Sequence, residues 1–399
     1  MSELYEHQRK LIEQNPSKIG IFFDCGAGKT LTAIRLAEKN VSNCLIICPK
    51  GLKDNWLDEI KKFSNGKVNF AIYSKEEFKK YLLIIPKYDA CILDEIHHAS
   101  SPKSQLHKAV LWYLEMYNVK YVYGLTATPL MASCWSVYGI GKILGHNWSW
   151  YQWKKRFFND IKMGRRYVPV QKKNIEKEIG TIINNIGVTA KLDDLFDVPE
   201  QIFLKEYFEL TNEQKKAIEN LVEPTSIVRW TYTHCIENGI KNSDGYDEIK
   251  VFDCEKTKRV VELCQEHKKI AVVARYNLQL EHYYNILSKN HTVFIINGKT
   301  DNKIDIVNKI NELNECVVLL QGACSEGFNL WSVPVMVFAS YDFSYKNYYQ
   351  MQRRILRANH LKKNVYISLI VKRGVDEDVY KSVVINKTDF YNKIFDKNL

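Results

Sequence analysis

Short apolar runs alternate with amphipathic stretches through the first half of the chain, and this rhythm limits the possible fold more than any other feature. Apolar residues at helical spacing predict a helix over Lys29–Lys39. Strands that alternate with helices indicate an α/β fold, in which a parallel sheet carries helices on both faces and ligands bind at the carboxyl ends of the strands. The predicted strands are Ile19–Phe23, Leu45–Cys48, Ala71–Tyr73, Ala90–Leu93 and Tyr121–Leu125.

The same rhythm returns after about residue 265 and predicts a second α/β lobe. Helical and loop-like sequence replaces it in between. We therefore expect a first lobe over residues 1–145, a mainly helical, basic insertion and linker over 146–253, and a second lobe over 254–399. In the second lobe the predicted strands are Ile270–Ala274, Val293–Ile296, Val317–Leu320 and Val335–Phe338, and the predicted helices are Leu278–Leu287 and Tyr345–Leu356.

The charge balance of the 399 residues is basic, with a formal net charge of +11. Such an excess favours a polyanionic partner such as nucleic acid, although charge that only serves solubility is the alternative. The ten cysteines include no Cys-x-x-Cys pair and no zinc-ligand spacing, which is typical of free thiols in a reducing compartment. The start of the chain does not read as a signal peptide, and no apolar run approaches the ~20 residues of a membrane span. We expect a soluble, intracellular protein.

Glycines directly after the first predicted strand indicate a phosphate-binding loop. Gly26, Ala27 and Gly28 can turn backbone amides towards phosphate oxygens at the start of the next helix. Lys29 would reach the β- and γ-phosphates of ATP, and the Thr30 hydroxyl would ligate Mg²⁺. The alternative is a glycine turn that only caps a helix.

Two carboxylates follow the strand Ala90–Leu93. Asp94 can hold Mg²⁺ directly or through water, and Glu95 can orient and deprotonate an attacking water. The alternative is an ordinary acidic helix start. For His97 and His98 we favour coupling or packing over metal binding, because no further ligands are suitably spaced.

A basic segment near the carboxyl end carries two arginines that could act on a γ-phosphate. Arg354 and Arg357 lie three residues apart on the predicted helix, hence on one face of it. An arginine that stabilises the charge on this group accelerates hydrolysis by about 10³–10⁵. The alternative is a solvated basic helix. With phosphate loop and arginines in different lobes, we expect ATP to bind between the lobes.

These motifs, in this order, resemble superfamily 2 helicases, and most of all the SNF2-type DNA translocases in the compact form found in phages and other viruses. The resemblance implies two RecA-like lobes, an adenine-reading role for Gln8 in Leu4–Gln8, and a nucleic-acid contact at Lys50 in Cys48–Leu52. It also covers Asp24–Thr30 and Asp94–His97. If the chain comes from a phage, the resemblance implies that the protein acts in the cytoplasm of a bacterial host.

Further motifs extend the resemblance over nearly the whole chain. It implies that the segment Gly124–Leu130 couples ATP to DNA through Thr126 and Thr128, and that Gln350 joins Arg354 and Arg357 in the arginine-finger motif. Two departures concern the subfamily: Ala127 stands where SNF2 proteins usually have glycine, and so does Arg353. The remaining implied roles are nucleic-acid contacts at Arg275 and Asn329 and a nucleotide contact at Gly327.

A basic, aromatic-rich segment lies in the predicted insertion, from Trp150 to Lys173. Its cations would track phosphates and its aromatic rings would stack on bases or wedge between them. The alternatives are that the aromatic residues form core and that the cations are a solvated face. The basic residues selected as nucleic-acid contacts are Lys154, Lys155, Arg165 and Arg166.

The combined interpretation is an ATP-dependent DNA motor, a DNA-stimulated ATPase that uses Mg²⁺ and translocates on or remodels duplex or branched DNA. Single-stranded DNA is a further candidate, no membrane is involved, and a monomer is expected. Alternatives are a strand-separating or branch-migrating helicase, an RNA helicase and a non-catalytic DNA clamp switched by ATP. Glu95, Arg354 and Arg357 argue against the clamp, and the second lobe argues against a simple P-loop kinase.

Overall fold

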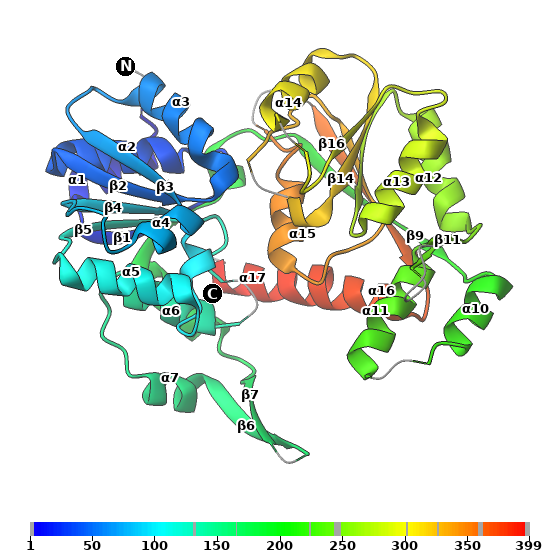
Figure 1. Ribbon diagram of the computed structural model, residues 1–399, viewed down its shortest axis with the longest axis horizontal. Helices are drawn as coiled ribbons and strands as arrows, with labels where there is room; N and C mark the ends of the chain where they lie inside the picture. The colour runs from blue at the N-terminus through cyan, green and yellow to red at the C-terminus, as the bar shows by residue number, and fades with distance from the viewer. Residues whose placement is uncertain are drawn as a thin grey trace. The chain divides into compact units, whose positions relative to one another are not determined.

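The computed structural model describes residues 4–130, 133–164, 166–222, 225–242, 249–300, 302–324, 327–357 and 362–395. Backbone contacts divide the chain into two compact units, residues 1–196 with 390–399 and residues 197–389. Each unit is built around a six-stranded sheet whose strands are all parallel (Figure 1).

The first sheet has the strand order β3-β2-β4-β5-β1-β8. Its central strands are apolar throughout because helices cover both faces, so both sets of alternating side chains are buried. In β2, for example, every residue from Cys44 to Cys48 is buried. The strands are β1 (Lys18–Phe23), β2 (Asn43–Cys48), β3 (Asn69–Ser74), β4 (Ala90–Asp94), β5 (Tyr121–Leu125) and β8 (Gly187–Ala190).

One face of this sheet forms a core with several helices of the same unit. Side chains that alternate along the strands, such as Leu45 and Ile47 of β2, pack there against Phe78 of α4, Val110 of α5 and Ile140 of α6. The helices of the unit are α1 (Glu6–Gln14), α2 (Lys29–Asn40), α3 (Lys53–Phe63), α4 (Lys75–Tyr81), α5 (Gln105–Met116), α6 (Trp135–Ile143), α7 (Trp150–Phe157), α8 (Glu176–Ile186) and α9 (Leu192–Leu195), with 3₁₀ turns η1 (Lys50–Leu52) and η2 (Ile96–Ala99).

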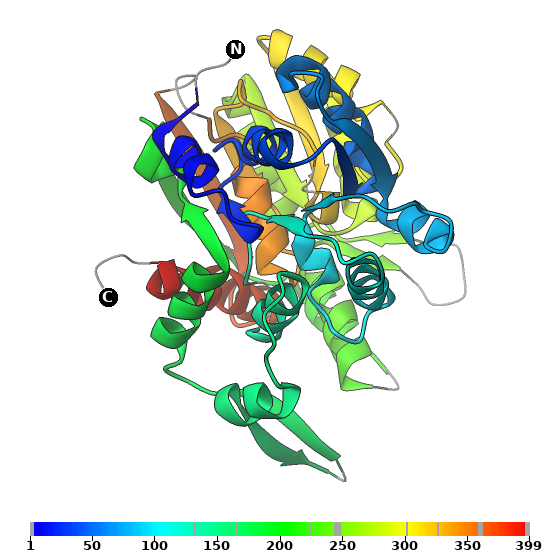
Figure 2. The same cartoon turned by 90° about the vertical axis from the view of Figure 1, so that its left-hand side faces the viewer.

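A two-stranded antiparallel hairpin extends away from the first sheet. It consists of β6 (Phe158–Met163) and β7 (Arg166–Gln171), which pair with Ile161 opposite Val168. Figures 1 and 2 both show it projecting beyond the body of its unit. Nearly every residue of β7 is exposed, so this ribbon has solvent on both of its faces.

The second sheet has the order β13-β14-β12-β15-β16-β9. Its strands are β9 (Glu200–Phe208), β12 (Lys269–Ala274), β13 (Val293–Ile296), β14 (Cys316–Gln321), β15 (Val335–Phe338) and β16 (Lys363–Val371). The other elements are α10 (Asn212–Glu219), α11 (Ser226–Glu237), β10 (Ile240–Asn242), β11 (Ile249–Val251), α12 (Glu255–Glu266), α13 (Asn277–Leu287), α14 (Lys303–Glu312), η3 (Gly322–Cys324), α15 (Tyr345–Gln352), α16 (Val375–Tyr380), the π-helical turn η4 (Lys381–Asn386) and α17 (Lys387–Phe395).

The prediction of two parallel-sheet α/β lobes with helices between them is confirmed. The segment 146–253 contains the expected helices, but it also supplies β8 to the first sheet and β9 to the second. The division after Phe196 therefore differs from the boundaries expected from the sequence. The helix predicted over Tyr345–Leu356 was too long, because α15 ends at Gln352 and turns follow.

The cysteines and the apolar segments of the chain can both be located in the structure. All ten cysteines are free thiols, and eight of them are buried. Among the described residues, no helix combines the length and the apolar character that crossing a membrane requires.

Candidate functional site

The phosphate loop connects β1 to α2 and requires glycine at two positions. Gly26 and Gly28 adopt φ angles of 89° and 83°, in the left-handed region that residues with a Cβ rarely occupy. A Cβ at Gly28 would also lie 2.4 Å from the amide nitrogen of Gln8. Ala27, between them, donates its backbone N–H to the Asp24 carbonyl oxygen. The loop thus forms a tight turn that ends at the first residue of α2.

Lys29 lies over this loop. Its ammonium group donates hydrogen bonds to the carbonyl oxygens of Phe23, at 2.9 Å, and Asp24, at 3.1 Å. The Asp24 carboxylate accepts from the backbone N–H of Leu192 at 3.0 Å, which ties the loop to the segment after β8. Thr30 follows on the first turn of α2 and is half-buried.

Gln8 is fully buried, and its side chain contacts the phosphate loop. Its amide nitrogen donates to the Gly28 carbonyl at 3.0 Å and to the Thr32 hydroxyl at 3.1 Å, and its amide oxygen accepts from the Tyr5 backbone at 2.9 Å. An amide nitrogen has two hydrogens, so both are engaged. Adenine reading by Gln8 stays a prediction; the role seen here is to fix the phosphate loop.

Asp94 ends β4 and is half-buried among polar groups. Its carboxylate accepts from the indole N–H of Trp56 at 2.8 Å and from the backbone N–H of Glu95 at 2.9 Å. Burial and the neighbouring Glu95 carboxylate raise the pKa of Asp94, while the Trp56 hydrogen bond and the charges of Lys29 and Lys75 act to lower it. The influence of Lys29 places the phosphate loop within electrostatic reach of Asp94.

Glu95 is held in an unusual backbone conformation. Its φ of 48° and ψ of 55° are uncommon for a residue with a side chain, and such conformations concentrate at functional sites. Its buried carboxylate lies 3.0 Å from Nδ1 of His97 and accepts from the Thr126 hydroxyl at 3.4 Å. His97 and Thr126 also share a hydrogen bond of 2.8 Å. The coupling or packing role expected for His97 stays a prediction.

The donor groups near the phosphate loop fit a magnesium ion. Mg²⁺ prefers oxygen ligands, keeps several waters, and is usually held by one or two carboxylates together with substrate phosphates. Thr30 and Asp94 offer a hydroxyl and a carboxylate of this kind. Within the described ranges there is no cluster of three or more His, Cys, Asp or Glu residues that could hold a metal ion.

Two residues expected to contact nucleic acid are buried. Thr126 and Thr128 have no exposed surface, and the Thr126 hydroxyl accepts from the Thr128 backbone N–H at 3.1 Å. Direct contact by either side chain requires a rearrangement of this loop. Lys50 is exposed on η1, directly after β2, as a phosphate contact requires.

The predicted arginines lie after the end of α15 and are anchored to the loop that contains Gly327. Arg354 donates to the Phe328 carbonyl at 2.8 Å, and Arg357 donates to the Asn329 side chain and, at 2.6 Å, to the Arg353 carbonyl. The expectation that both share a helix face was wrong, because the helix has ended. What the structure brings together instead is Asn329 and Arg357.

Three further positions complete the candidate residues of the second unit. Gln350 is fully buried on α15. Gly327 has a φ of 85° and so needs the freedom of glycine. Arg275 pairs with Asp342 at 3.1 Å and lies over the Phe343 ring, 3.6 Å from its centroid. Much of the Arg275 guanidinium is therefore engaged within its own unit.

The basic aromatic segment forms α7 and the hairpin. Half of its six aromatic side chains belong to the core, since Trp153, Phe157 and Phe158 are buried, whereas Trp150, Tyr151 and Tyr167 are exposed. The cations divide into two groups. Lys154 pairs with Asp160 at 2.7 Å and Arg156 with Glu178, whereas Lys155 and Arg166 are exposed. Arg165 lies outside the described residues.

Sequence reasoning missed two residues that shape the site. Trp56 is buried and donates the N–H of its indole to the carboxylate of Asp94, 38 positions further along the sequence. A buried indole usually finds an acceptor, but nothing in the sequence indicates which one. Lys75, at the start of α4, is also buried and influences Asp94. Its position directly after β3, at a strand's carboxyl end, was the available signal.

Comparison with known proteins agrees with this geometry. Residues 255–359 match the family model of the helicase conserved C-terminal domain. Over 160 residues, 29% of this chain, the sequence is 26% identical to human TATA-binding protein-associated factor 172, of which the match covers 8%. Over 133 residues, 32% of this chain, it is 32% identical to a protein of Acanthamoeba polyphaga mimivirus named ATP-dependent RNA helicase L538, covering 29% of it. The matches thus span well under two thirds of either relative.

Among solved structures, the helicase domain of Hef from Pyrococcus furiosus superposes with a TM-score of 0.57 at 14% identity, covering 95% of this chain and 97% of that domain. The SWI2/SNF2 ATPase core of Sulfolobus solfataricus in complex with duplex DNA aligns over 100% of this chain and 96% of that chain at 20% identity, with a TM-score of 0.44. The domain match shows that residues 255–359 are similar to a helicase carboxyl-terminal domain, and the superposition on the Hef helicase domain shows that the fold is shared.

Proposed function

We propose that this chain is an ATP-dependent DNA motor, a DNA-stimulated ATPase of SNF2 type that translocates on or remodels duplex or branched DNA. The observation that carries the proposal is the group of residues at the carboxyl ends of β1, β4 and β5. Lys29 follows β1, Asp94 and Glu95 follow or end β4, and Thr126 follows β5. A phosphate loop, a magnesium carboxylate and a base are the parts that ATP hydrolysis needs.

Each residue has a separate role in this proposal. The loop amides around Gly26 and Gly28 and the Lys29 ammonium bind the nucleotide phosphates, and Thr30 and Asp94 hold Mg²⁺, which would neutralise charge on the β- and γ-phosphates. Glu95 orients the attacking water and takes its proton. The hydrogen bonds to His97 and Thr126 keep its carboxylate in one orientation.

The arginines are proposed to act on the γ-phosphate. Arg354 and Arg357 carry permanent charge, and their anchoring to Phe328 and Asn329 fixes where the guanidinium groups lie within the second unit. Gly327, Gln350 and Gln8 are proposed nucleotide-site residues on the resemblance of their motifs.

Three features favour a nucleic acid as the partner. The net charge of +11 favours a polyanion, the hairpin carries exposed cations such as Arg166, and Lys50 is exposed after β2. The SNF2-like motifs favour duplex tracking. The compact form, without long insertions, suggests a phage or other viral source.

RNA is the second candidate partner, because the mimivirus relative carries the name of an RNA helicase. Phosphate contacts alone do not distinguish DNA from RNA, since recognition of RNA depends on the 2′-hydroxyl and on shape. The choice therefore needs a direct comparison of activators.

Steady-state ATP turnover tests the proposal. It is measured without nucleic acid and with single-stranded DNA, duplex, fork, four-way junction and RNA, and Lys29→Ala serves as the control for contaminating ATPase. Stimulation by duplex or branched DNA is the expected result. Stimulation by RNA alone would favour the second candidate, and an absence of turnover with every activator would contradict a motor.

A fork-unwinding assay then separates the remaining alternatives. A strand-separating or branch-migrating helicase releases a labelled strand, whereas a duplex translocase hydrolyses ATP and displaces a bound protein without releasing the strand. Glu95→Gln, which is expected to bind ATP without hydrolysing it, must fail in both assays.

A further inference from the structure

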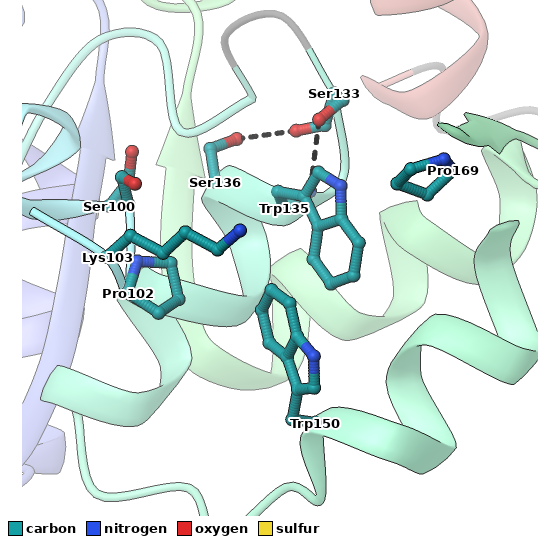
Figure 3. A pocket seen from close by; sticks show the side chains of 9 residues that line it. Ser100, Pro102, Lys103, Ser133, Trp135, Ser136, Trp150 and Pro169 are labelled. Atoms are coloured by element: carbon teal, nitrogen blue, oxygen red, sulfur yellow. Dashed lines mark hydrogen bonds between the residues drawn. The ribbon is translucent and has the colours of Figure 1, made fainter. Parts of the chain in front are cut away.

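A pocket of about 350 Å³ lies in the first unit, beside the segment that carries Glu95. We call it the tryptophan pocket, because Trp135 and Trp150 form one side of it (Figure 3). Its volume is at the small end of ligand sites, enough for one flat aromatic group rather than a folded segment. The remaining lining residues are Ser100, Ser101, Pro102, Lys103, Ser133, Ser136 and Pro169.

The two tryptophans are fixed by ring stacking. Their centroids lie 4.2 Å apart with an interplanar angle of 16°, and the Trp135 ring also stacks on Phe158 at 4.0 Å. Trp150 nevertheless keeps 39% of its surface exposed. A rigid, partly exposed indole is a suitable stacking surface, because little conformational entropy is lost when another ring packs against it.

The polar groups of the pocket are hydroxyls and one cation. Figure 3 shows Lys103 extending along the side opposite Pro169. The serine pair is ordered, since the Ser136 hydroxyl donates to the Ser133 carbonyl at 2.9 Å. The described residues that line the pocket include Lys103 and no aspartate or glutamate, so the pocket suits an aromatic group attached to an anion.

The surroundings indicate which aromatic anion this is. Trp150 begins α7 and Pro169 lies in β7, so the hairpin with its exposed cations starts at the pocket. Lys155, Lys162 and Arg166 are exposed on these elements. A free nucleotide needs a compact phosphate site, whereas cations spread along a ribbon match the repeated charges of a nucleic-acid backbone.

We propose that the tryptophan pocket holds one base of a DNA strand, stacked on Trp150, with Lys103 close to an adjoining phosphate. This rests on the proposed function, and it adds a base-binding subsite to the phosphate contacts expected of such a motor. Pairing is lost when a base enters a pocket, so the subsite engages a base that is already unpaired, as in the arm of a fork.

The pocket is also connected to the catalytic loop. Ser100 donates its backbone N–H to the His97 carbonyl at 3.1 Å, and His97 contacts Glu95. On the other side α6 lies directly on Ser100, because a Cβ at Gly139 would be 1.7 Å from the Ser100 carbonyl oxygen. A base in the pocket would therefore contact the segment that continues from Glu95 and His97.

The test uses a labelled fork whose single-stranded arm is either oligothymidylate or an abasic chain of equal length and charge. Wild-type protein is expected to bind the first fork roughly 5- to 150-fold more tightly, which is the value of stacking one base on an aromatic ring. Trp150→Ala should remove this preference and Trp150→Phe should retain most of it. Tyr151→Ala is the matched control, because Tyr151 neighbours Trp150 on α7, is 72% exposed and does not line the pocket.

Lys103→Ala gives a separate reading. This variant should bind both forks more weakly, and the slope of log affinity against log salt concentration should fall by about one counterion. Lys108→Ala, at an exposed lysine of α5, is the control. If Trp150→Ala is too unstable to measure, Ser101→Trp tests the same proposal. The new indole fills the exposed rim of the pocket without removing a contact. It should also abolish the preference for the oligothymidylate fork over the abasic fork.

The outcomes separate the two proposals. If wild-type protein binds neither fork and neither stimulates ATP turnover, the motor itself is overturned. If both forks bind and stimulate, yet Trp150→Ala and Ser101→Trp keep the wild-type preference, only the base pocket is overturned; the pocket would then suit an apolar side chain of a protein partner. Loss of the preference in both variants, with Tyr151→Ala unchanged, supports the base pocket.

Discussion

Nδ1 of His97 lies 2.8 Å from the hydroxyl of Thr126, a contact that joins two loops 29 residues apart beside Glu95. The contact links the loop that is expected to hold the catalytic base with the loop that is expected to sense DNA. Because Thr126 is fully buried, its side chain is not accessible to DNA in this conformation, and its proposed role is to couple the two loops.

Thr126→Val removes this link and keeps the volume of the side chain. The Glu95 carboxylate and His97 would lose a shared hydroxyl, and a buried polar group left without its partner costs about 1–3 kcal/mol. We expect DNA-stimulated turnover to fall roughly tenfold or more at unchanged ATP affinity, since 1.4 kcal/mol corresponds to a factor of ten.

Thr128→Val is the comparison for this variant. Thr128 is equally buried in the same loop, but its hydroxyl has no hydrogen-bond partner. It should cost less turnover than Thr126→Val. Equal losses in the two variants, measured side by side under saturating DNA, would show that the contact with His97 is unimportant.

Glu95→Gln is expected to abolish hydrolysis while ATP binding persists. The amide keeps the shape of the side chain but cannot take a proton from water, and loss of a general base typically lowers turnover by about 10²–10⁴. Turnover and the binding of a fluorescent ATP analogue are measured in parallel. Wild-type turnover in this variant would mean that another group is the base.

Arg357→Lys tests the arginine proposal through the separation of kcat from KM. Lysine keeps the charge but cannot span Asn329 and a phosphate with a planar fork. For a group that acts in the transition state, kcat should fall by up to about 10³–10⁵ while KM for ATP changes little. A lowered melting temperature with nearly normal kcat would instead indicate that Arg357 only anchors the loop at Asn329.

Sequence patterns predicted the parallel-sheet framework well, because strands buried on both faces appear as continuous apolar runs such as Leu45–Cys48. Strands with exposed faces were missed for the opposite reason. β9 is an edge strand of the second sheet, and its large apolar residues Phe203, Leu204 and Tyr207 are substantially exposed. Its sequence therefore lacks the regular alternation of apolar and polar residues that indicates a strand. Only its pairing with β16 defines it as a strand.

Residues of the candidate site were predictable where chemistry requires a residue type at a fixed place after a strand, as for Lys29 and Asp94. The supporting contacts were not. Gln8 with Thr32, and Trp56 with Asp94, are pairs brought together by helix packing over 24 and 38 residues of sequence. Such pairs depend on tertiary geometry, which local patterns do not contain.

Gly139→Ala should disturb the catalytic segment from a distance. The new methyl would lie 1.7 Å from the Ser100 carbonyl oxygen, so α6 and η2 must separate. Overpacking of this kind costs about 1–3 kcal/mol of stability, and turnover should fall because η2 begins next to Glu95. Gly51→Ala is the control, since nothing lies within 4 Å of its added Cβ. Similar melting temperatures for the two variants would contradict the close approach.

The last prediction concerns a buried ionic network in the second unit. Asp376 is fully buried and pairs with Lys256 at 2.8 Å and with His234 at 3.2 Å. Burial by itself would raise the pKa of Asp376, but Lys256 and His234 lower it well below its usual range. Glu237 accepts from the backbone N–H groups of Asp376 and Val375, yet burial and the Asp376 charge raise the pKa of Glu237 to about 7.

Glu237 should therefore make stability depend on pH between about 4.5 and 7. In this window the folded state keeps a proton that the unfolded state has released, so the contribution of Glu237 to the free energy of unfolding falls as pH rises, by up to about 3 kcal/mol. The lowered pKa of His234, caused by burial, acts in the opposite direction, so the wild-type curve alone does not isolate Glu237. The difference in the free energy of unfolding between wild type and Glu237→Gln isolates the contribution of Glu237. Urea unfolding at a series of pH values in this range should show that the variant gains stability relative to wild type as pH rises. Glu281→Gln, at an exposed position of α13, should run parallel to wild type. A Glu237→Gln curve parallel to wild type would mean that Glu237 is ionised in the folded protein throughout the range.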